Sequence, residues 1–173
     1  MKGDGSLKRN IHIETEFNEK YDKYCRLVYR TAYQYLFNID LAEDVVQEVF
    51  VKLFTNKKSF NDDEHEKAWL LRVTINLCKN VLKSKTYYCL ELKNEAEIFE
   101  NSFEERSDTK IDIMNQLKKL SAEQRIAIYL YYYERFSIKE ISKVMKIKEN
   151  TVKSHLKRAK QNLRMNLERE QNL

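Results

Sequence analysis

Proline is absent from this 173-residue sequence, and its two glycines lie at positions 3 and 5. Because these residues are the ones that most often interrupt helices, almost every segment is free to be helical. Apolar residues do not alternate with period two over any long stretch, which disfavours β-strands. The expected fold class is therefore all-α.

Long apolar runs and paired cysteines are also missing. No stretch approaches the about eighteen apolar residues that a membrane span needs, and the start of the chain is polar, so we expect neither membrane insertion nor a secretory signal. The cysteines, Cys25, Cys78 and Cys89, are odd in number and show no C-x-x-C spacing. Reduced thiols in a cytoplasmic protein are the expectation, rather than a disulfide framework or a metal site.

Signatures of catalysis are missing as well. The sequence contains no H-E-x-x-H, no glycine-rich phosphate loop and no nucleophile paired with a base. The run DDEHE at 62–66 carries side chains that can bind metal, but adjacent residues rarely converge on one ion. We therefore expect no enzymatic activity, no metal and no cofactor.

Charge is distributed unevenly along the chain. Residues 1–90 carry a net charge of +2, residues 91–111 carry −4 and residues 112–173 carry +7. This pattern indicates three parts with separate roles, and the basic end indicates a polyanionic partner.

Helical spacing of apolar residues is clear in the first part. It predicts a helix over 17–37 and a second one within NIDLAEDVVQEVFVKLF, where Asp40 and Glu43 resemble a capping box. The inward stripe of that second helix is predicted to contain Ala42, Val45, Val49 and Leu53. Another of its faces collects Asp44, Gln47 and Glu48.

Residues 55–68 lose this periodicity and are predicted to form a loop. A long helix is then predicted over 67–85, with an apolar side that contains Ala68, Leu71, Ile75, Cys78 and Leu82. A single polar stripe follows steps of four, three and four residues through Arg72, Asn76, Lys79 and Lys83.

The acidic stretch 86–109 has weak periodicity and is predicted to be a linker. Order is expected again from residue 111, with two possible capping boxes, Ser121 with Gln124 and Ser137 with Glu140. Within 137–163, two helical apolar stripes are separated by a break at 146–148. Their members are Ile138, Ile141, Val144 and Met145, then Val152, Leu156, Ala159 and Leu163.

Two short helices joined by such a turn are typical of a helix-turn-helix, whose second helix enters the DNA major groove. Lysines and Arg158 can neutralise phosphates, whereas Asn150, Thr151, Lys153 and Ser154 can hydrogen-bond base edges. The alternative from the residues alone is an amphipathic hairpin with a solvated basic face.

Two segments carry a family resemblance. LSAEQRIAIYLYYYERFSIKEISKVMKIKENTVKSHLKRAKQNLR resembles the promoter-binding C-terminal domain of bacterial sigma factors. DLAEDVVQEVFVKLF, followed by AWLLRVTINLCKNVLKSK, resembles the other domain of their extracytoplasmic-function (ECF) group, within the sigma-70 family. Both halves stand in the family's order and spacing. The resemblance implies a sigma factor that binds core RNA polymerase, recognises the −35 and −10 elements of promoter DNA and assists melting.

The resemblance also implies roles for residues. Asp44, Gln47 and Glu48 match the face that docks on the β′ coiled coil of polymerase, where carboxylates can bind arginines; the alternative is a solvated acidic face. The −10 element is implied to contact a loop and a basic stripe, which suit single-stranded DNA: Ser59, Phe60, Asn61, Arg72, Asn76, Lys79, Asn80 and Lys83. Trp69 invites a stacking role as well, but a place in the core is favoured for it.

The −35 element is implied to contact Glu149, Asn150, Thr151, Lys153, Ser154, Lys157 and Arg158. Three departures from the family pattern affect the start of this recognition helix. Lys146 stands where the turn usually has glycine, so a left-handed backbone there would cost about 1 kcal/mol. Lys148 replaces a small capping residue and Asn150 replaces a glycine; capping by Asn150 would shorten the helix by about a turn.

The resulting division of the chain is an N-terminal tail (1–16), a region 2-like domain (17–86), a linker (87–110) and a region 4-like helix-turn-helix domain (111–173). Other implied partners are the polymerase β flap and an anti-sigma factor, and the implied location is the bacterial cytoplasm. Two alternatives stay open at this point. One is a helix-turn-helix regulator that acts without joining core polymerase, and the other is a protein-binding adaptor.

Overall fold

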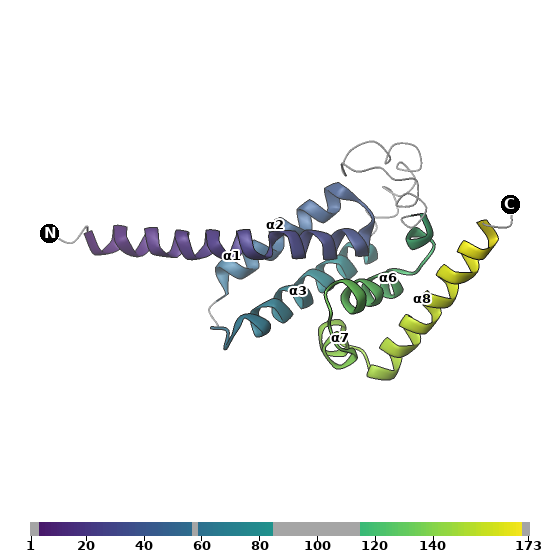
Figure 1. The fold of residues 1–173 in the computed structure, drawn as a ribbon. Helices are drawn as coiled ribbons and strands as arrows, with labels where there is room; N and C mark the ends of the chain where they lie inside the picture. The colour runs from purple at the N-terminus through teal and green to yellow at the C-terminus, as the bar shows by residue number, and fades with distance from the viewer. Residues whose placement is uncertain (1–3, 57–58, 85–114, 171–173) are drawn as a thin grey trace.

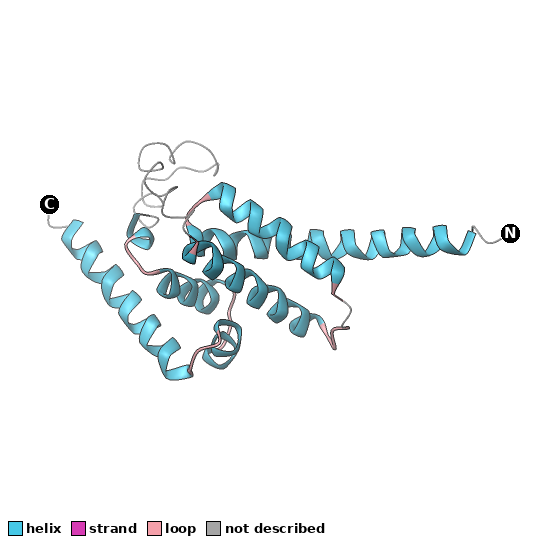
Figure 2. Ribbon diagram, turned by 180° about the vertical axis from the view of Figure 1, so that it is seen from behind, coloured by secondary structure: helices cyan, strands magenta, loops and turns pink. Residues whose placement is uncertain are grey.

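The computed structural model describes residues 4–56, 59–84 and 115–170, and these residues form helices joined by short connections, with no strand among them (Figures 1 and 2). The predicted all-α class is confirmed. No helix in these three stretches combines the length and apolarity that a membrane crossing requires. The elements are, in order, α1 (Asp4–Leu36), α2 (Ile39–Thr55), α3 (Asp63–Lys83), α6 (Ala122–Ile128), the π-helix η1 (Tyr129–Tyr133), α7 (Ile138–Met145) and α8 (Glu149–Glu170).

Helix α1 is longer than the predicted helix over 17–37, since it begins at Asp4. Its first turns extend beyond the other helices, whereas its second half packs against α2 and α3 (Figure 1). Val28, Ala32 and Tyr35 are buried in that half. These three helices form the first half of the molecule.

Helix α2 buries the predicted stripe, together with Val46 and Phe50. Its predicted capping box is wrong. The cap is Asn38, whose side-chain oxygen accepts a hydrogen bond from the Leu41 backbone N–H at 2.9 Å. Phe37 adopts a left-handed backbone (φ 51°), which ends α1 and makes Asn38 the residue before the new helix. Asp40 then lies inside the first turn, where its negative charge is favourable.

Helix α3 begins earlier than predicted, so the loop is shorter than 55–68. Asp62 is the N-cap residue, and its carboxylate accepts the His65 backbone N–H at 2.6 Å. The DDEHE run therefore supplies the cap and the acidic first turn of α3. Within the described stretches, no group of three or more His, Cys, Asp or Glu side chains is placed to hold a metal ion. Among the predicted apolar residues, Leu71, Ile75 and Cys78 are fully buried.

Both predicted capping boxes in the C-terminal part are confirmed, at Ser121 with Gln124 and at Ser137 with Glu140. In each one the serine hydroxyl oxygen accepts the backbone N–H of the third residue after it, and the side-chain oxygen of that residue accepts the serine N–H. These hydrogen bonds from Ser137 hold the pKa of the Glu140 carboxyl below its usual range. The helix-turn-helix therefore has a firmly defined first helix, α7.

The two helical parts pack against each other. Helix α6 contacts α1, and α7 contacts α3. Buried side chains from both parts, such as Leu71 and Ile75 on one side and Ile126, Ile141 and Met145 on the other, belong to one continuous apolar cluster. Cys78 lies in this cluster as a free thiol, and burial raises its pKa to about 12, which makes it unreactive. The predicted linker and Cys89 lie outside the described residues.

Candidate nucleic-acid interface

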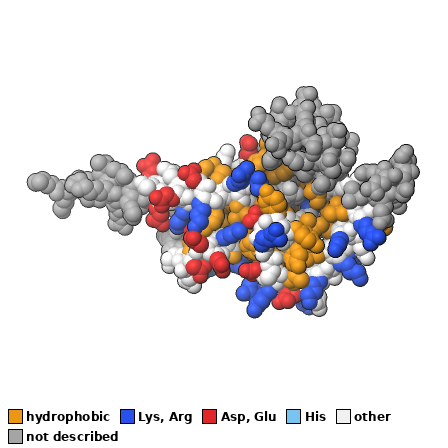
Figure 3. Space-filling model, viewed as in Figure 1, with side chains coloured by type: hydrophobic (Ala, Val, Ile, Leu, Met, Phe, Trp, Pro, Cys, Tyr) orange, Lys and Arg blue, Asp and Glu red, His pale blue; other side chains and the backbone are white. Residues whose placement is uncertain are grey.

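The recognition helix α8 presents all of its predicted DNA-contacting residues to solvent: Glu149, Asn150, Thr151, Lys153, Ser154, Lys157 and Arg158. Its opposite side buries Val152 and Ala159, which fix the helix on the rest of the molecule. Lys and Arg side chains gather over α7 and α8, and Asp and Glu side chains gather toward the end where α1 projects (Figure 3). The exposed face of α8 is thus a basic surface on a rigid support.

The start of α8 is fixed by the turn before it. Lys146 takes the left-handed conformation (φ 56°) that ends α7, in the position where a glycine would be easier. The carbonyl of Lys148 then accepts backbone N–H groups from Thr151 at 2.9 Å and Val152 at 3.1 Å. The helix begins at Glu149, so Asn150 lies inside its first turn and is not the cap.

The polar stripe on α3 is less open than the α8 face. Within the stripe, Arg72, Asn76 and Lys79 are half-buried and Lys83 is exposed; Asn80, beside the stripe, is exposed as well. The Lys79 ammonium donates a hydrogen bond to the backbone carbonyl of Met145, at the end of α7 (3.3 Å). The helix-turn-helix part therefore touches the stripe that sequence reasoning assigned to single-stranded DNA.

The loop before α3 is anchored by one aromatic ring. Phe60 is half-buried, with its ring 5.7 Å from that of His65 and 5.5 Å from that of Trp69. Trp69 is itself half-buried and packs against the core, which fits the favoured structural role. Ser59 and Asn61 flank the anchored ring and are exposed. The loop thus offers polar groups to solvent from a fixed position.

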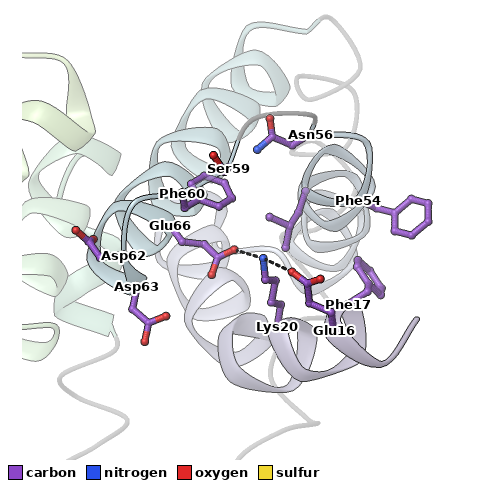
Figure 4. Close-up of a pocket in the computed structure, with 11 residues that line it drawn as sticks. Glu16, Phe17, Lys20, Phe54, Asn56, Ser59, Phe60, Asp62, Asp63 and Glu66 are labelled. Carbon is purple, nitrogen blue, oxygen red and sulfur yellow. Dashed lines mark ion pairs between the residues drawn. The ribbon is translucent and has the colours of Figure 1, made fainter. Parts of the chain in front are cut away.

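A hollow of about 600 Å³ opens beside this loop (Figure 4). Ser59 and Phe60 line it from the loop, Glu66 from α3, and Glu16 and Lys20 from α1. Phe17 lines it from α1 as well, and nothing in the sequence indicated that Glu16 and Lys20 belong to this site. They lie about forty positions upstream of Ser59 in the sequence, and no local pattern links segments that meet only by packing.

An ion-pair network forms the floor of the hollow. The Lys20 ammonium lies 2.9 Å from a Glu66 carboxylate oxygen and 3.2 Å from one of Glu16, and Figure 4 shows it between the two. Burial lowers the pKa of Lys20, but hydrogen bonds to the two carboxylates outweigh it and the pKa is raised. Glu66 is only 5% exposed, so this charged lysine balances an otherwise isolated buried carboxylate. Asp62 and Asp63 also line the hollow, which makes it acidic overall.

The acidic face of α2 is exposed as predicted at Asp44, Gln47 and Glu48. Two large apolar side chains on the same helix are exposed as well, Val51 (60%) and Phe54 (59%). Sequence reasoning did not single them out, although Val51 follows Gln47 and Glu48 by four and three positions, the spacing of one helix face. Acidic and apolar groups therefore lie together on this surface.

Comparison with known proteins identifies the family. Residues 21–87 match the family described as Sigma-70 region 2, and residues 110–163 match Sigma-70, region 4. The ECF RNA polymerase sigma factor SigM of Bacillus subtilis is 30% identical over 151 residues, which cover 85% of this chain and 92% of the relative. The chain belongs to the ECF sigma factors. SigW of Bacillus subtilis, another ECF sigma factor, is 27% identical over 165 residues, or 87% of this chain and 88% of the relative.

Solved structures show the same fold as this sigma factor. The sigma factor RpoE of Bartonella quintana, in complex with the anti-sigma factor NepR, matches with a TM-score of 0.69 and 25% identity, over 88% of this chain and 97% of that one. CnrH, in complex with the cytosolic domain of CnrY, matches with a TM-score of 0.63 and 21% identity, over 90% and 89% of the two chains. The region 2 match contains α2, α3 and the part of α1 from residue 21 onward. The region 4 match contains α6, α7 and the part of α8 up to residue 163.

Proposed function

We propose that this ECF sigma factor binds core RNA polymerase in the bacterial cytoplasm, delivers it to promoters through their −35 and −10 elements, and assists melting without chemistry of its own. The observation that carries this proposal is the recognition helix α8, whose polar and basic face is open while its apolar face is buried. Such a helix supports reading of a major groove. The proposed parts are 17–86 for polymerase and the −10 element and 111–173 for the −35 element, joined by the acidic linker 87–110.

Base reading is assigned to the first turns of α8. With the helix beginning at Glu149, Asn150, Lys153 and Ser154 lie near its N-terminal end, the part that faces base edges in this motif. The Ser154 hydroxyl donates to the Asn150 carbonyl at 2.8 Å, so its oxygen is free to accept from a base amino group. Lys157 and Arg158 lie a turn later and are assigned to phosphates.

Strand capture is assigned to the loop, the hollow and the α3 stripe. The hollow has excess negative charge, because four carboxylates line it against one lysine. A phosphate would be repelled there, whereas an uncharged nucleobase would find apolar contact with Phe60 and a hydrogen-bonding group at Ser59. The cations of the stripe, Arg72, Lys79 and Lys83, are then the groups that hold the strand's backbone.

Polymerase binding is assigned to the exposed face of α2, which would meet the β′ coiled coil, with the β flap binding the region 4-like part. Exposed carboxylates suit arginines on the partner, and the adjacent Val51 and Phe54 supply apolar area that would be buried on docking. RpoE of Bartonella quintana is bound by an anti-sigma factor, and we infer the same kind of partner for this chain.

The assignment of α2 is tested by charge reversal. Asp44→Arg combined with Glu48→Arg is expected to abolish co-purification with core polymerase, because both arginines would face arginines on the partner. Both side chains are exposed. The substitution removes the ion pair between Glu48 and Lys52, a surface pair that contributes about 0.3–0.5 kcal/mol.

The matched control is Glu19→Arg combined with Asp22→Arg, the same charge change on exposed positions of α1. Far-ultraviolet circular dichroism verifies that both variants stay helical. If the α2 variant still co-purified with core polymerase, this face would be a solvated surface with no role in binding. An equal loss of binding in both variants would show a general effect of charge instead.

A further inference from the structure

The two halves of the molecule are joined by reciprocal contacts at helix ends. The last carbonyls of an α-helix have no partner within the helix and carry partial negative charge. Two helices here, α1 and α7, each end in a left-handed residue that is not glycine, Phe37 and Lys146. In both cases a cation from the opposite half of the molecule binds the carbonyls near that end.

Arg125 of α6 binds the end of α1. Its Nε donates to the Gln34 carbonyl at 2.9 Å and one Nη donates to the Tyr35 carbonyl at 3.1 Å. Its guanidinium carbon also lies 4.6 Å from the centroid of the Phe37 ring. A planar guanidinium satisfies two carbonyls and an aromatic face at once, which a lysine cannot do.

Lys79 of α3 makes the converse contact, through its hydrogen bond to the Met145 carbonyl near the end of α7. Two further pairs connect the halves along their edge. Arg30 of α1 donates to the Tyr133 hydroxyl at 2.8 Å, and the Lys67 ammonium of α3 lies 3.1 Å from a Glu134 carboxylate oxygen. Cations thus cross the boundary in both directions.

We propose that these contacts form a latch that keeps the −10 face of the unbound sigma factor closed while the −35 helix stays open. The latch engages Lys79 and covers part of the α3 stripe, whereas every predicted −35 contact on α8 is exposed. Duplex −35 DNA can bind the closed form, but capture of the −10 strand requires α7 to leave α3. The DNA consequence rests on the proposed function; the latch itself rests on the contacts alone.

The latch is tested by the reactivity of lysine amines in the full chain. Limiting N-hydroxysuccinimide acetate is added, and acetylation is measured by mass spectrometry of peptides, with exposed Lys83 on the same helix as the internal reference. Lys79 is expected to react several-fold more slowly than Lys83 in the unaltered protein. Arg125→Met is expected to raise the Lys79 rate toward that of Lys83.

Arg125 also binds the Leu120 carbonyl within its own half, at 2.6 Å, so a second variant avoids that contact. Arg30→Gln combined with Lys67→Gln removes two boundary pairs from the region 2 side and is expected to raise the Lys79 rate as well. The matched control is Arg26→Gln combined with Lys52→Gln, at exposed positions away from the boundary, and is expected to change nothing.

Equal rates for Lys79 and Lys83 in the unaltered protein would overturn the latch. The latch would also be overturned if the acetylation rate of Lys79 stayed low in the Arg30→Gln, Lys67→Gln double variant. The two boundary pairs would then have no part in covering Lys79. The labelling uses neither DNA nor polymerase, so its failure removes the latch and leaves the sigma-factor function standing. Failure to initiate transcription would instead remove only the consequence for DNA.

Discussion

Individual backbone conformations show what the shortage of glycine means for this chain. Three residues in the described stretches that are not glycine have positive φ: Phe37 (51°), Arg135 (62°) and Lys146 (56°). A left-handed backbone costs about 1–2 kcal/mol for such residues. At Phe37 the stacked Arg125 offsets part of this cost. Lys146 is exposed, and near it the Ser142 carbonyl accepts the backbone N–H groups of Lys146 and Ile147. Strain at Lys146 is predicted from the sequence, because related turns usually have glycine at this position.

Lys146→Gly is therefore expected to stabilise the protein by up to about 1 kcal/mol, because glycine adopts the left-handed conformation without a steric penalty. The measurement is the urea midpoint of unfolding, followed by circular dichroism. Lys143→Gly is the matched control, since Lys143 is exposed inside α7 and glycine there should cost about 1 kcal/mol. A lower midpoint for Lys146→Gly would show that the turn carries no such strain.

Helices and their ends were predictable where a local pattern decides them. Ser137 with Glu140 follows a turn and precedes an apolar stripe, and nothing nearby competes for the cap. Asp40 with Glu43 matched the same pattern, but the N-cap of α2 is Asn38, because the position of the cap depends on where α1 ends. The loop predicted at 55–68 was too long for a related reason. The acidic residues after Asp62 have the polarity of a loop, but acidic residues are also favourable in the first turn of a helix, and here they begin α3.

The start of the recognition helix gives a prediction for two of its lysines. Lys153 is assigned to a base edge and Lys157 to a phosphate. Lys153→Ala is expected to change which −35 sequences are preferred, at a cost of about 1–3 kcal/mol at one base pair. Lys157→Ala is expected to weaken all sequences alike and to lower the slope of log affinity against log salt by about one unit.

The measurement is binding to duplexes with a randomised −35 element at two salt concentrations. Each variant serves as the control for the other, since both remove one exposed lysine from α8. An unchanged sequence ranking for Lys153→Ala would mean that other residues of the helix face the bases.

At the scale of the whole molecule, the charge pattern predicted parts with separate roles but gave no sign that the two helical parts share one apolar cluster. The residues that join them are unremarkable in sequence. Arg125 is one cation among many, and its partners Gln34 and Tyr35 contribute backbone carbonyls, which any residue has. The hollow beside Ser59 was unpredictable for the same reason, because α1 completes it only after folding. The polar stripe on α3 could be found by its spacing, but its partial burial could not.

Transcription in vitro tests the central claim most directly. Purified core RNA polymerase is incubated with this protein and a library of promoter fragments, and transcripts are mapped to their start sites. The account predicts initiation at defined positions, downstream of shared −35 and −10 sequences, that core polymerase alone does not produce. The contradictory result is no initiation with core polymerase but altered output from a polymerase that already carries another sigma factor, which would make this protein a regulator that acts without joining core.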